Sequence, residues 1–332
     1  MAARTARRLV QSTIREALTQ LYERVLAPLG VRFERPALVS FLFHGVFESR
    51  SEVESGVVHP QEAMTTSDFE QFIEYFSGAG YRFVSVAEIE RGLDEQGRYV
   101  CMTFDDGYAS TVRIVDLLRA YSVPAVVYVS TSYVESGKRY WWDTVWDERL
   151  RRGTSASEIA REIGFLESQL PEAVDRYLAR EFGPSAARPK SDLDRPLTAR
   201  ELGELAKEEQ VTIGNHTADH VVLAGLDAEL ARTQLEDAQL YLERALGTPP
   251  TSVSYPEGAY DAATLEVARD LGFASGFTTV RRRERLPAGP QLLELGRFQL
   301  RRSTSPTRQM RAARSELRLA DAARGALRHR TG

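Results

Sequence analysis

Short apolar runs that alternate with segments of helical spacing are the feature that most constrains this fold. The runs cover residues 37–43, 81–86, 100–104, 124–130, 211–214, 252–255, 274–279 and 295–300. Strands buried on both faces read as continuous apolar runs, and they belong to parallel sheets whose connections are helices. Seven or eight strand–helix units fit a barrel better than an open sheet, so the sequence predicts an α/β fold of the (β/α)7-8 type.

The segments between the runs carry helix signals of their own. Residues 68–80 place four apolar side chains on one face and follow Ser67, a candidate N-cap. Thr198 and Glu201 have the spacing of a capping box at the start of a helix over 198–209. A charged stretch at 137–196, rich in Arg and Glu, interrupts the alternation and predicts a helical insertion over one face of the barrel.

Both ends of the chain are basic, although the whole chain has a net charge of −4. Residues 1–35 hold seven Arg and three acids, and residues 301–332 hold nine Arg and two acids. We therefore expect a basic amphipathic helical extension at 1–35, a main domain at 36–305 and a basic helical tail at 306–332. Such ends are either solvated helix faces or contacts for an anionic membrane, and the overall charge gives no attraction to nucleic acid.

The sequence also limits where the protein is expected to work. No signal peptide is apparent, and no run approaches the roughly 20 apolar residues that span a bilayer. Cys101 is the single cysteine, so the chain has no internal disulfide and gives no sign of an oxidising compartment. We expect a cytoplasmic protein, or one held peripherally at the inner face of the membrane by its basic ends.

Two adjacent acids, Asp105 and Asp106, follow the apolar run at 100–104 and precede Gly107. Two carboxylates at the mouth of a buried strand repel each other, and a metal cation beside them removes much of that cost. The alternative is an ordinary Asp-Gly turn after a strand. His216 and His220 also follow a strand, and imidazoles four residues apart meet one metal if the segment makes a helical turn.

Strand ends of this kind build the active sites of barrels, so the acids and the histidines are expected to meet. Asp106, His216 and His220 then form a set of two histidines and one carboxylate that leaves coordination positions open for water and substrate.

Three motifs resemble, in order and spacing, those of the polysaccharide deacetylases, the NodB-homology domain of carbohydrate esterase family four. They are Thr103-Phe-Asp-Asp-Gly107, His216-Thr-Ala-Asp-His220 and Ser254-Tyr-Pro-Glu-Gly258. Phe43-His44-Gly45-Val46 after the first strand, the Trp-Trp-Asp around Trp142, and Arg297 also look like that family. The resemblance covers about residues 36–305 and implies a distorted, incomplete barrel of the deacetylase type.

The resemblance also implies roles for the motif residues. Asp105 would be the general base, and Asp106, His216 and His220 would hold a divalent metal, most often zinc, with cobalt, nickel or manganese as alternatives. The metal would polarise the carbonyl and lower the pKa of its water. In the third motif the backbone N–H of Glu257 would stabilise the oxyanion. Its neighbours Tyr255, Pro256 and Gly258 are the other residues of that motif predicted at the oxyanion and substrate site.

The chain departs from the family pattern in two places. Ser254 stands where many members have an arginine that steadies the catalytic Asp. Arg297 is predicted among the substrate and oxyanion residues, and it is also a candidate to supply that charge from another strand. The late Leu-x-His that often provides the general acid is absent. His44 is our candidate acid, and the alternative is that it only bonds loop backbone.

Three further residues receive predictions of a simpler kind. His59, in a polar loop, is expected at the surface. Trp142 and Asp143 are expected either to wall the sugar site or to belong to the core.

Together these features predict a metal-dependent hydrolase that removes an N-acetyl or O-acetyl group from a sugar or glycan in intracellular polysaccharide or glycoconjugate biosynthesis. The expected partner is a carbohydrate that bears an acyl group. One rival is a deformylase, or another hydrolase of non-peptide C–N bonds, acting on a lipid- or nucleotide-linked sugar. A second rival is a catalytically inactive relative that binds carbohydrate.

Overall fold

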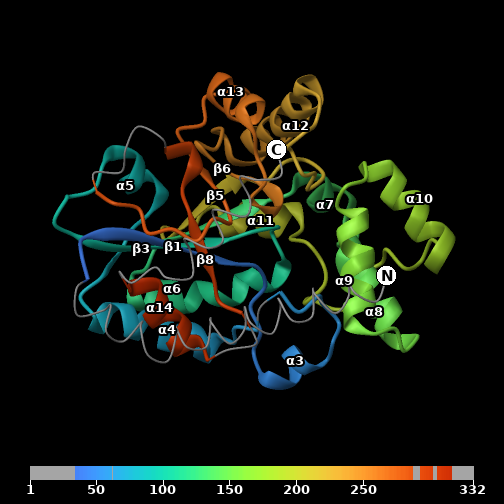
Figure 1. Cartoon of the computed structure of the whole chain (residues 1–332), viewed down its shortest axis with the longest axis horizontal. Helices are drawn as coiled ribbons and strands as arrows, with labels where there is room; N and C mark the ends of the chain where they lie inside the picture. Colours follow the sequence, from blue (N-terminus) through green and yellow to red (C-terminus); the bar gives the residue numbers. More distant parts are fainter. Residues whose placement is uncertain (1–33, 62, 287–291, 302–304, 316–332) are drawn as a thin grey trace, which may run out of the picture.

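The computed structural model describes residues 34–61, 63–286, 292–301 and 305–315. Residues 1–33 of the predicted N-terminal extension and 316–332 of the predicted C-terminal tail lie outside these residues. The remainder forms one sheet surrounded by helices (Figure 1). Within the described residues, no helix is long and apolar enough to cross a membrane.

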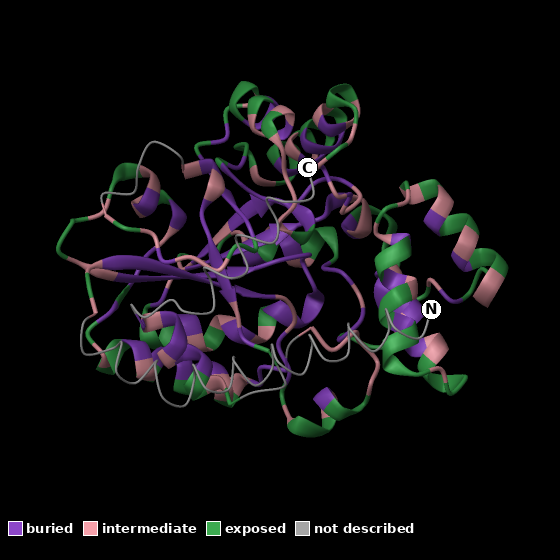
Figure 2. Ribbon diagram, viewed as in Figure 1, coloured by how far each residue is buried: buried purple, intermediate pink, exposed green. Residues whose placement is uncertain are grey.

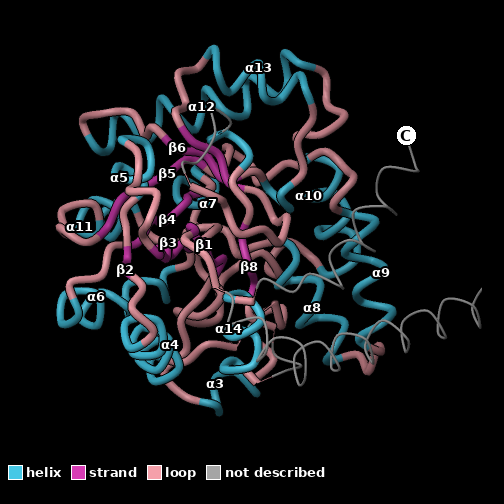
Figure 3. The backbone as a smooth tube through the Cα atoms, turned by 60° about the vertical axis from the view of Figure 1, so that its left-hand side comes forward, coloured by secondary structure: helices cyan, strands magenta, loops and turns pink. Residues whose placement is uncertain are grey.

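The sheet is parallel throughout and confirms the predicted α/β barrel. Its strands are β1 (Ala37–Phe43), β2 (Arg82–Phe83), β3 (Arg98–Phe104), β4 (Ala125–Val129), β5 (Val211–Asn215), β6 (Ser252–Ser254), β7 (Ser275–Phe277) and β8 (Arg297–Gln299). Their order is β7-β6-β5-β4-β3-β1-β8, and β2 pairs with the first half of β3. A bridge from Phe277 to Leu295 brings β7 against the residues just before β8, so the two edges nearly close the barrel (Figure 3).

Helices cover the outside of this barrel. On one side lie α4 (Thr66–Gly78), α6 (Val115–Tyr121) and α14 (Pro306–Arg314), and on the other α12 (Ala228–Leu246) and α13 (Ala262–Asp270) (Figure 1). Shorter helices α3 (Arg50–Glu54), α5 (Val86–Arg91) and α11 (Ala199–Leu205) complete the crossovers. The strands are almost wholly buried, whereas each helix exposes its outer face (Figure 2).

Local sequence signals set most helix starts. The capping box predicted from Thr198 and Glu201 is confirmed at the start of α11. For α4 the predicted cap, Ser67, is wrong. The cap is Thr65, whose side chain accepts from the backbone N–H of Asp68 while the Asp68 carboxylate accepts from the Thr65 N–H. This reciprocal pair satisfies two donors at the helix end, and Ser67 lies inside the first turn.

The predicted insertion contains three helices that stand beside the barrel, and α7 (Thr131–Ser136) directly precedes them. They are α8 (Trp141–Arg151), α9 (Ala156–Leu166) and α10 (Pro171–Phe182), the green group at the right of Figure 1. These three pack around their own small core, which includes Trp142, Ile163 and Leu178. Tyr140, at the N-cap of α8, donates its hydroxyl to the Asp106 carbonyl at 2.8 Å, so the insertion is fastened to the end of β3.

The main core contains a group of phenylalanine rings between the sheet and α4. Phe72 of α4 meets Phe41 and Phe43 of β1 edge-on, with ring centroids 4.9 and 5.5 Å apart. Phe72 is fully buried. Its packing is one of the contacts that hold α4 against β1, the strand that leads into His44.

Replacing Phe72 with alanine is predicted to lower the free energy of unfolding by about 3–5 kcal/mol, because the deleted ring leaves a cavity among its neighbours. Chemical denaturation followed by circular dichroism measures this. Phe165→Ala is the matched control, since Phe165 is 60% exposed, and a change within about 0.5 kcal/mol is expected there. Equal effects of the two substitutions would contradict the packing described here.

Candidate active site

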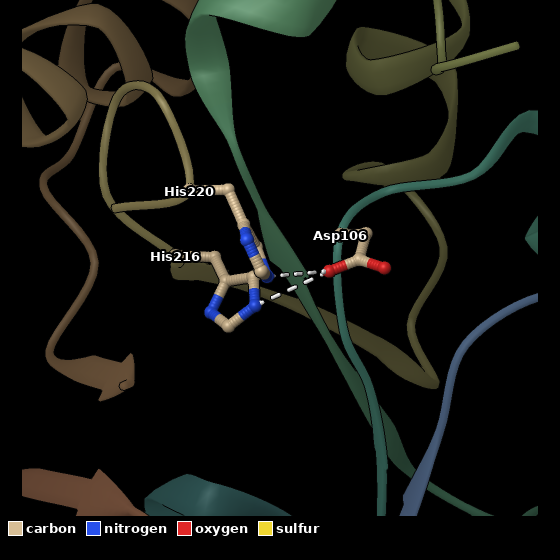
Figure 4. Close-up of side chains that lie close together, drawn as sticks. All are labelled: Asp106, His216 and His220. Carbon is tan, nitrogen blue, oxygen red and sulfur yellow. Dashed lines mark ion pairs between the residues drawn. The ribbon is translucent and has the colours of Figure 1, made fainter. Parts of the chain in front are cut away.

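Asp106, His216 and His220 come together at the ends of β3 and β5 (Figure 4). The Nε2 atom of each histidine lies 3.3 Å from Oδ1 of Asp106. Their candidate ligand atoms all lie within 4.8 Å of one another. The three residues are therefore arranged as the sequence predicted, around a single point.

The local backbone that achieves this differs from the expected helical turn. The segment from His216 to Leu223 contains no helix, and Thr217 and His220 have left-handed φ values of 65° and 56°. Asp106 and Glu257 are left-handed too, with φ values of 72° and 56°. Such conformations are unfavourable for residues with a Cβ and occur where the surrounding structure enforces them.

Neighbouring groups orient the two imidazoles. His216 Nδ1 lies 2.7 Å from the Ser254 carbonyl oxygen, so Nδ1 carries the proton and Nε2 is directed toward Asp106. The ring of Trp142 packs on His220 with centroids 4.6 Å apart. Trp142 in turn donates its indole N–H to the Tyr108 hydroxyl, which donates to Asp143.

The donor set fits a divalent cation. Both carboxylate oxygens of Asp106 are buried, and neither accepts a hydrogen bond from the described residues. Burial alone would raise the pKa of Asp106, but the two imidazoles outweigh it and hold this pKa well below its usual range. Burial would likewise lower the pKa of His220, and Asp106 raises it instead. An ionised carboxylate with two oriented imidazole nitrogens is a typical site for zinc and similar metals.

Asp105 stands beside this centre and is held by a buried arginine. Arg297 donates Nη1 to Oδ1 and Nη2 to Oδ2 of Asp105, each at 2.8 Å. Ser254 Oγ donates to Oδ2 at 2.9 Å. Burial would raise the pKa of Asp105, but the Arg297 charge, followed by His216, holds it below its ordinary value. Asp105 is thus an ionised carboxylate whose orientation is set from two other strands.

Arg297 also corrects a prediction. It was grouped with the substrate and oxyanion residues, but it lies behind Asp105, is 1% exposed and does not line the cavity. Its guanidinium makes the contact with Asp105 that the sequence assigned to it as a candidate, and Nη2 also donates to Ser254 at 2.9 Å. Serine is small enough to leave room for a guanidinium that comes from β8.

Only one residue of the third motif faces the cavity. Glu257 is exposed and lines it, whereas Tyr255 and Pro256 are buried and Gly258 lies behind Glu257. A Cβ on Gly258 would stand 2.3 Å from the backbone nitrogen of Thr279, which explains the glycine. Tyr255, Pro256 and Gly258 are not among the residues that line the cavity, and their place at the substrate and oxyanion site stays a prediction.

A cavity of about 730 Å³ contains these groups. Its barrel side is lined by Asp105, His216, His220, His44 and Glu257, and its other side by residues of α8–α10 such as Ile163, Leu166 and Leu178. Glu167, at the end of α9, faces the same space, and burial followed by the nearby Glu257 raises its pKa. No motif identified Glu167, because the insertion that carries it has no pattern beyond helical spacing.

Two predictions for aromatic and acidic neighbours are refined. Trp142 lines the cavity but is 4% exposed, so it mainly supports His220. Asp143 is fully buried outside the cavity lining, where it accepts from the backbone N–H of His59 at 2.6 Å and from Tyr108 at 2.7 Å. It is a support for the site and does not wall it.

The two remaining histidines also lie at the cavity. His44 lines it beside Asp105, as a candidate acid requires. The expectation that His59 is a surface residue is wrong, because His59 lines the same cavity and its ring meets Trp146 edge-on at 5.3 Å. Four of the five histidines of the chain thus converge on one site. The scarcity of histidine was the available signal, because two of the five already fall in one strand-end motif and the others are therefore candidates for the same site.

These features define a parallel barrel with a candidate metal site at the carboxyl ends of its strands. A sequence profile described as polysaccharide deacetylase matches residues 93–276, just over half of the chain. The chain belongs to the polysaccharide deacetylase family, whose members are metal-dependent hydrolases of acylated carbohydrates.

Individual relatives agree with this assignment. YxkH of Bacillus subtilis, which carries the name of a polysaccharide deacetylase, is 31% identical over 83 residues, 25% of this chain and 29% of YxkH. The deacetylase PplD of Streptococcus pyogenes, solved with acetate, aligns with a TM-score of 0.56 at 20% identity, over 84% of this chain and 99% of that one. IcaB from Ammonifex degensii aligns with a TM-score of 0.57 at 19% identity, over 84% and 97%. Both structures share the fold.

Breaking the buried ion pair with Arg297→Met is predicted to lower the free energy of unfolding by about 3–5 kcal/mol at pH 7, because Asp105 is left charged and buried. The double variant Asp105→Asn with Arg297→Met should recover part of the loss, since the stranded charge is removed. Denaturant titration of both variants provides the measurement. Arg301→Met, at an exposed position, is the control, and a double variant no more stable than the single one would contradict the ion-pair assignment.

Asp143 is predicted to make stability depend on pH. Burial raises its pKa to about 7, so the folded state binds its proton more tightly than the unfolded chain does. Its contribution is therefore complete below the ordinary carboxyl pKa and is lost as pH rises toward 7. Wild type should lose stability relative to Asp143→Asn between about pH 4 and pH 7. Unfolding measured at several pH values tests this, and parallel curves for the two proteins would exclude it.

Proposed function

We propose that this protein removes an N-acetyl group from a sugar unit of a glycan or glycoconjugate. The observation that carries the proposal is the position of Asp105, an ionised and doubly anchored carboxylate whose Oδ2 lies 3.9 Å from Nε2 of His216. A fixed proton acceptor next to a metal-type donor set, inside a cavity, is the arrangement that hydrolysis of an amide needs.

The proposed reaction divides its proton transfers between two residues. A metal held by Asp106, His216 and His220, with zinc as the preferred ion, would polarise the amide carbonyl and make its water more acidic. Asp105 takes a proton from the attacking water as the new C–O bond forms. The backbone N–H of Glu257 is the proposed donor to the oxyanion. As the C–N bond breaks, His44 gives a proton to the departing amine, leaving acetate and the free amino sugar.

The supports of Asp105 suit this role. Because Arg297 and Ser254 occupy both of its oxygens from behind, the carboxylate cannot rotate away from the cavity. Holding a base in its reactive orientation avoids the cost of ordering it during the reaction. His44 lies near enough to Asp105 and Asp106 that its positive charge contributes to lowering the pKa of both.

Substrate, metal and location are parts of the same proposal. We propose an acetylated amino sugar met inside the cell, with cobalt, nickel or manganese as alternative ions. Contact of the basic ends with anionic membrane stays a prediction, since residues 1–33 and 316–332 lie outside the described residues.

The test uses the full-length protein loaded with zinc and N-acetylglucosamine tetrasaccharide as the probe. Asp105→Asn should lower kcat by about 10²–10⁴-fold, because the proton acceptor is lost, while bound zinc stays near one ion per chain. Asp106→Asn should lose the zinc itself. Acetate release and elemental analysis give the two readouts, and Asp116→Asn, at an exposed site on α6, is the control.

The outcomes also separate the rival functions. Release of formate from N-formyl sugars in place of acetate would favour a deformylase. Zinc bound without release from any acylated sugar would favour the binding protein. A wild-type protein that binds no divalent metal would reject the site described above.

A further inference from the structure

The loop that carries His59 and Gln61 presents two buried polar atoms for which the proposed reaction has no use. Both residues line the catalytic cavity together with His44 and Asp105. His59 Nδ1 and Gln61 Oε1 are each buried, and neither has a hydrogen-bond partner among the residues that the structure describes. Buried polar atoms are almost always satisfied, so a pair of such atoms at an active-site cavity indicates a partner from outside the chain.

The position of this loop is well defined. The backbone N–H of His59 donates to Asp143 Oδ1 at 2.6 Å, and the backbone N–H of Gln61 donates to the His59 carbonyl at 2.8 Å. Asp143 is joined through Tyr108 to Trp142, the ring that packs on His220. This one chain of contacts both orients His220 and holds the loop that carries His59. The loop therefore lies at a fixed distance from the candidate metal site.

The two side chains are suited to a neutral, hydroxylated ligand. Burial, followed by the nearby charge of His44, lowers the pKa of His59 to about 4, so its ring is neutral at neutral pH. A neutral imidazole has one donor and one acceptor nitrogen, and a carboxamide likewise donates and accepts. Sugar hydroxyls do both, whereas a phosphate or carboxylate would require cationic partners.

We propose that His59 and Gln61 form a hydroxyl-binding pair that positions the sugar ring over Asp105 and the three metal-site residues. This inference rests on the proposed function, because it takes the substrate to be an acylated sugar. It assigns specificity for a hydroxyl near the acylated amine to a loop outside the family motifs. The pair takes no part in moving protons.

A purely structural role is the competing explanation. A second cavity of about 20 Å³ lies behind the loop and is also lined by His44, His59 and Gln61. That space suffices for one water, which could satisfy both buried atoms. In that case the two side chains would stabilise the loop and would have no effect on substrate affinity.

The experiment compares His59→Phe and Gln61→Leu with His59→Gln, which keeps polar atoms at the same place. The zinc-loaded, full-length protein is assayed on N-acetylglucosamine tetrasaccharide. We expect KM to rise about tenfold in the first two variants, as the loss of one or two net hydrogen bonds gives. The kcat value should stay within about threefold, and His59→Gln should recover part of the affinity. Glu54→Gln, exposed on α3 and outside the cavity, is the control.

A second measurement separates this proposal from the function on which it rests. Calorimetric binding of the same tetrasaccharide to zinc-loaded Asp105→Asn needs no turnover, and adding His59→Phe should weaken that binding about tenfold. Absence of acetate release by wild type would reject the proposed function while this binding effect still supported the pair. Unchanged KM and unchanged binding, with a lower melting temperature, would overturn the pair in favour of the buried water.

Discussion

The buried ion pair between Arg297 and Asp105 is the interaction on which the site depends. From β8 the guanidinium reaches Thr103 on β3, Asp105 just after it, Ser254 on β6 and the Thr278 carbonyl after β7. The Arg297 side chain thus links β8 and the end of β7, the two edges of the nearly closed sheet, to β3 inside it. Because a buried charge without its partner is costly, barrel closure and the ionised state of Asp105 are coupled.

The residues at the candidate metal site show the same dependence on their surroundings. Ser254 supplies its carbonyl oxygen to His216 and its hydroxyl to Asp105, so one short strand orients both a proposed ligand and the proposed base. On the opposite side the insertion supplies Trp142, which packs on His220. The helical insertion therefore does more than cover one face, since it completes the support of the centre.

Sequence reasoning located the parts of this site that depend on short-range pattern. Asp105, Asp106, His216 and His220 directly follow apolar strands, and parallel strands end at one edge, so their convergence could be inferred. Arg297 was only a candidate, because its contact with Asp105 spans 192 residues and depends on how the barrel closes. His59 was missed because a polar loop has no periodicity that reveals its inner side. The strand predicted at 81–86 is only two residues long in the structure, Arg82–Phe83. It ends there because β4 pairs with the same edge of β3 from Met102 onward.

The left-handed backbone at the site has a consequence for how this protein can evolve. Four of the five non-glycine residues with positive φ in the described part of the chain are Asp106, Thr217, His220 and Glu257. Local strain is thus concentrated where the side chains must already stand in their working geometry. Selection for heat resistance alone would favour relaxing these positions, and selection for turnover would oppose it. Gains in thermal tolerance are therefore expected to arise on the outer helices, with the strand ends left as they are.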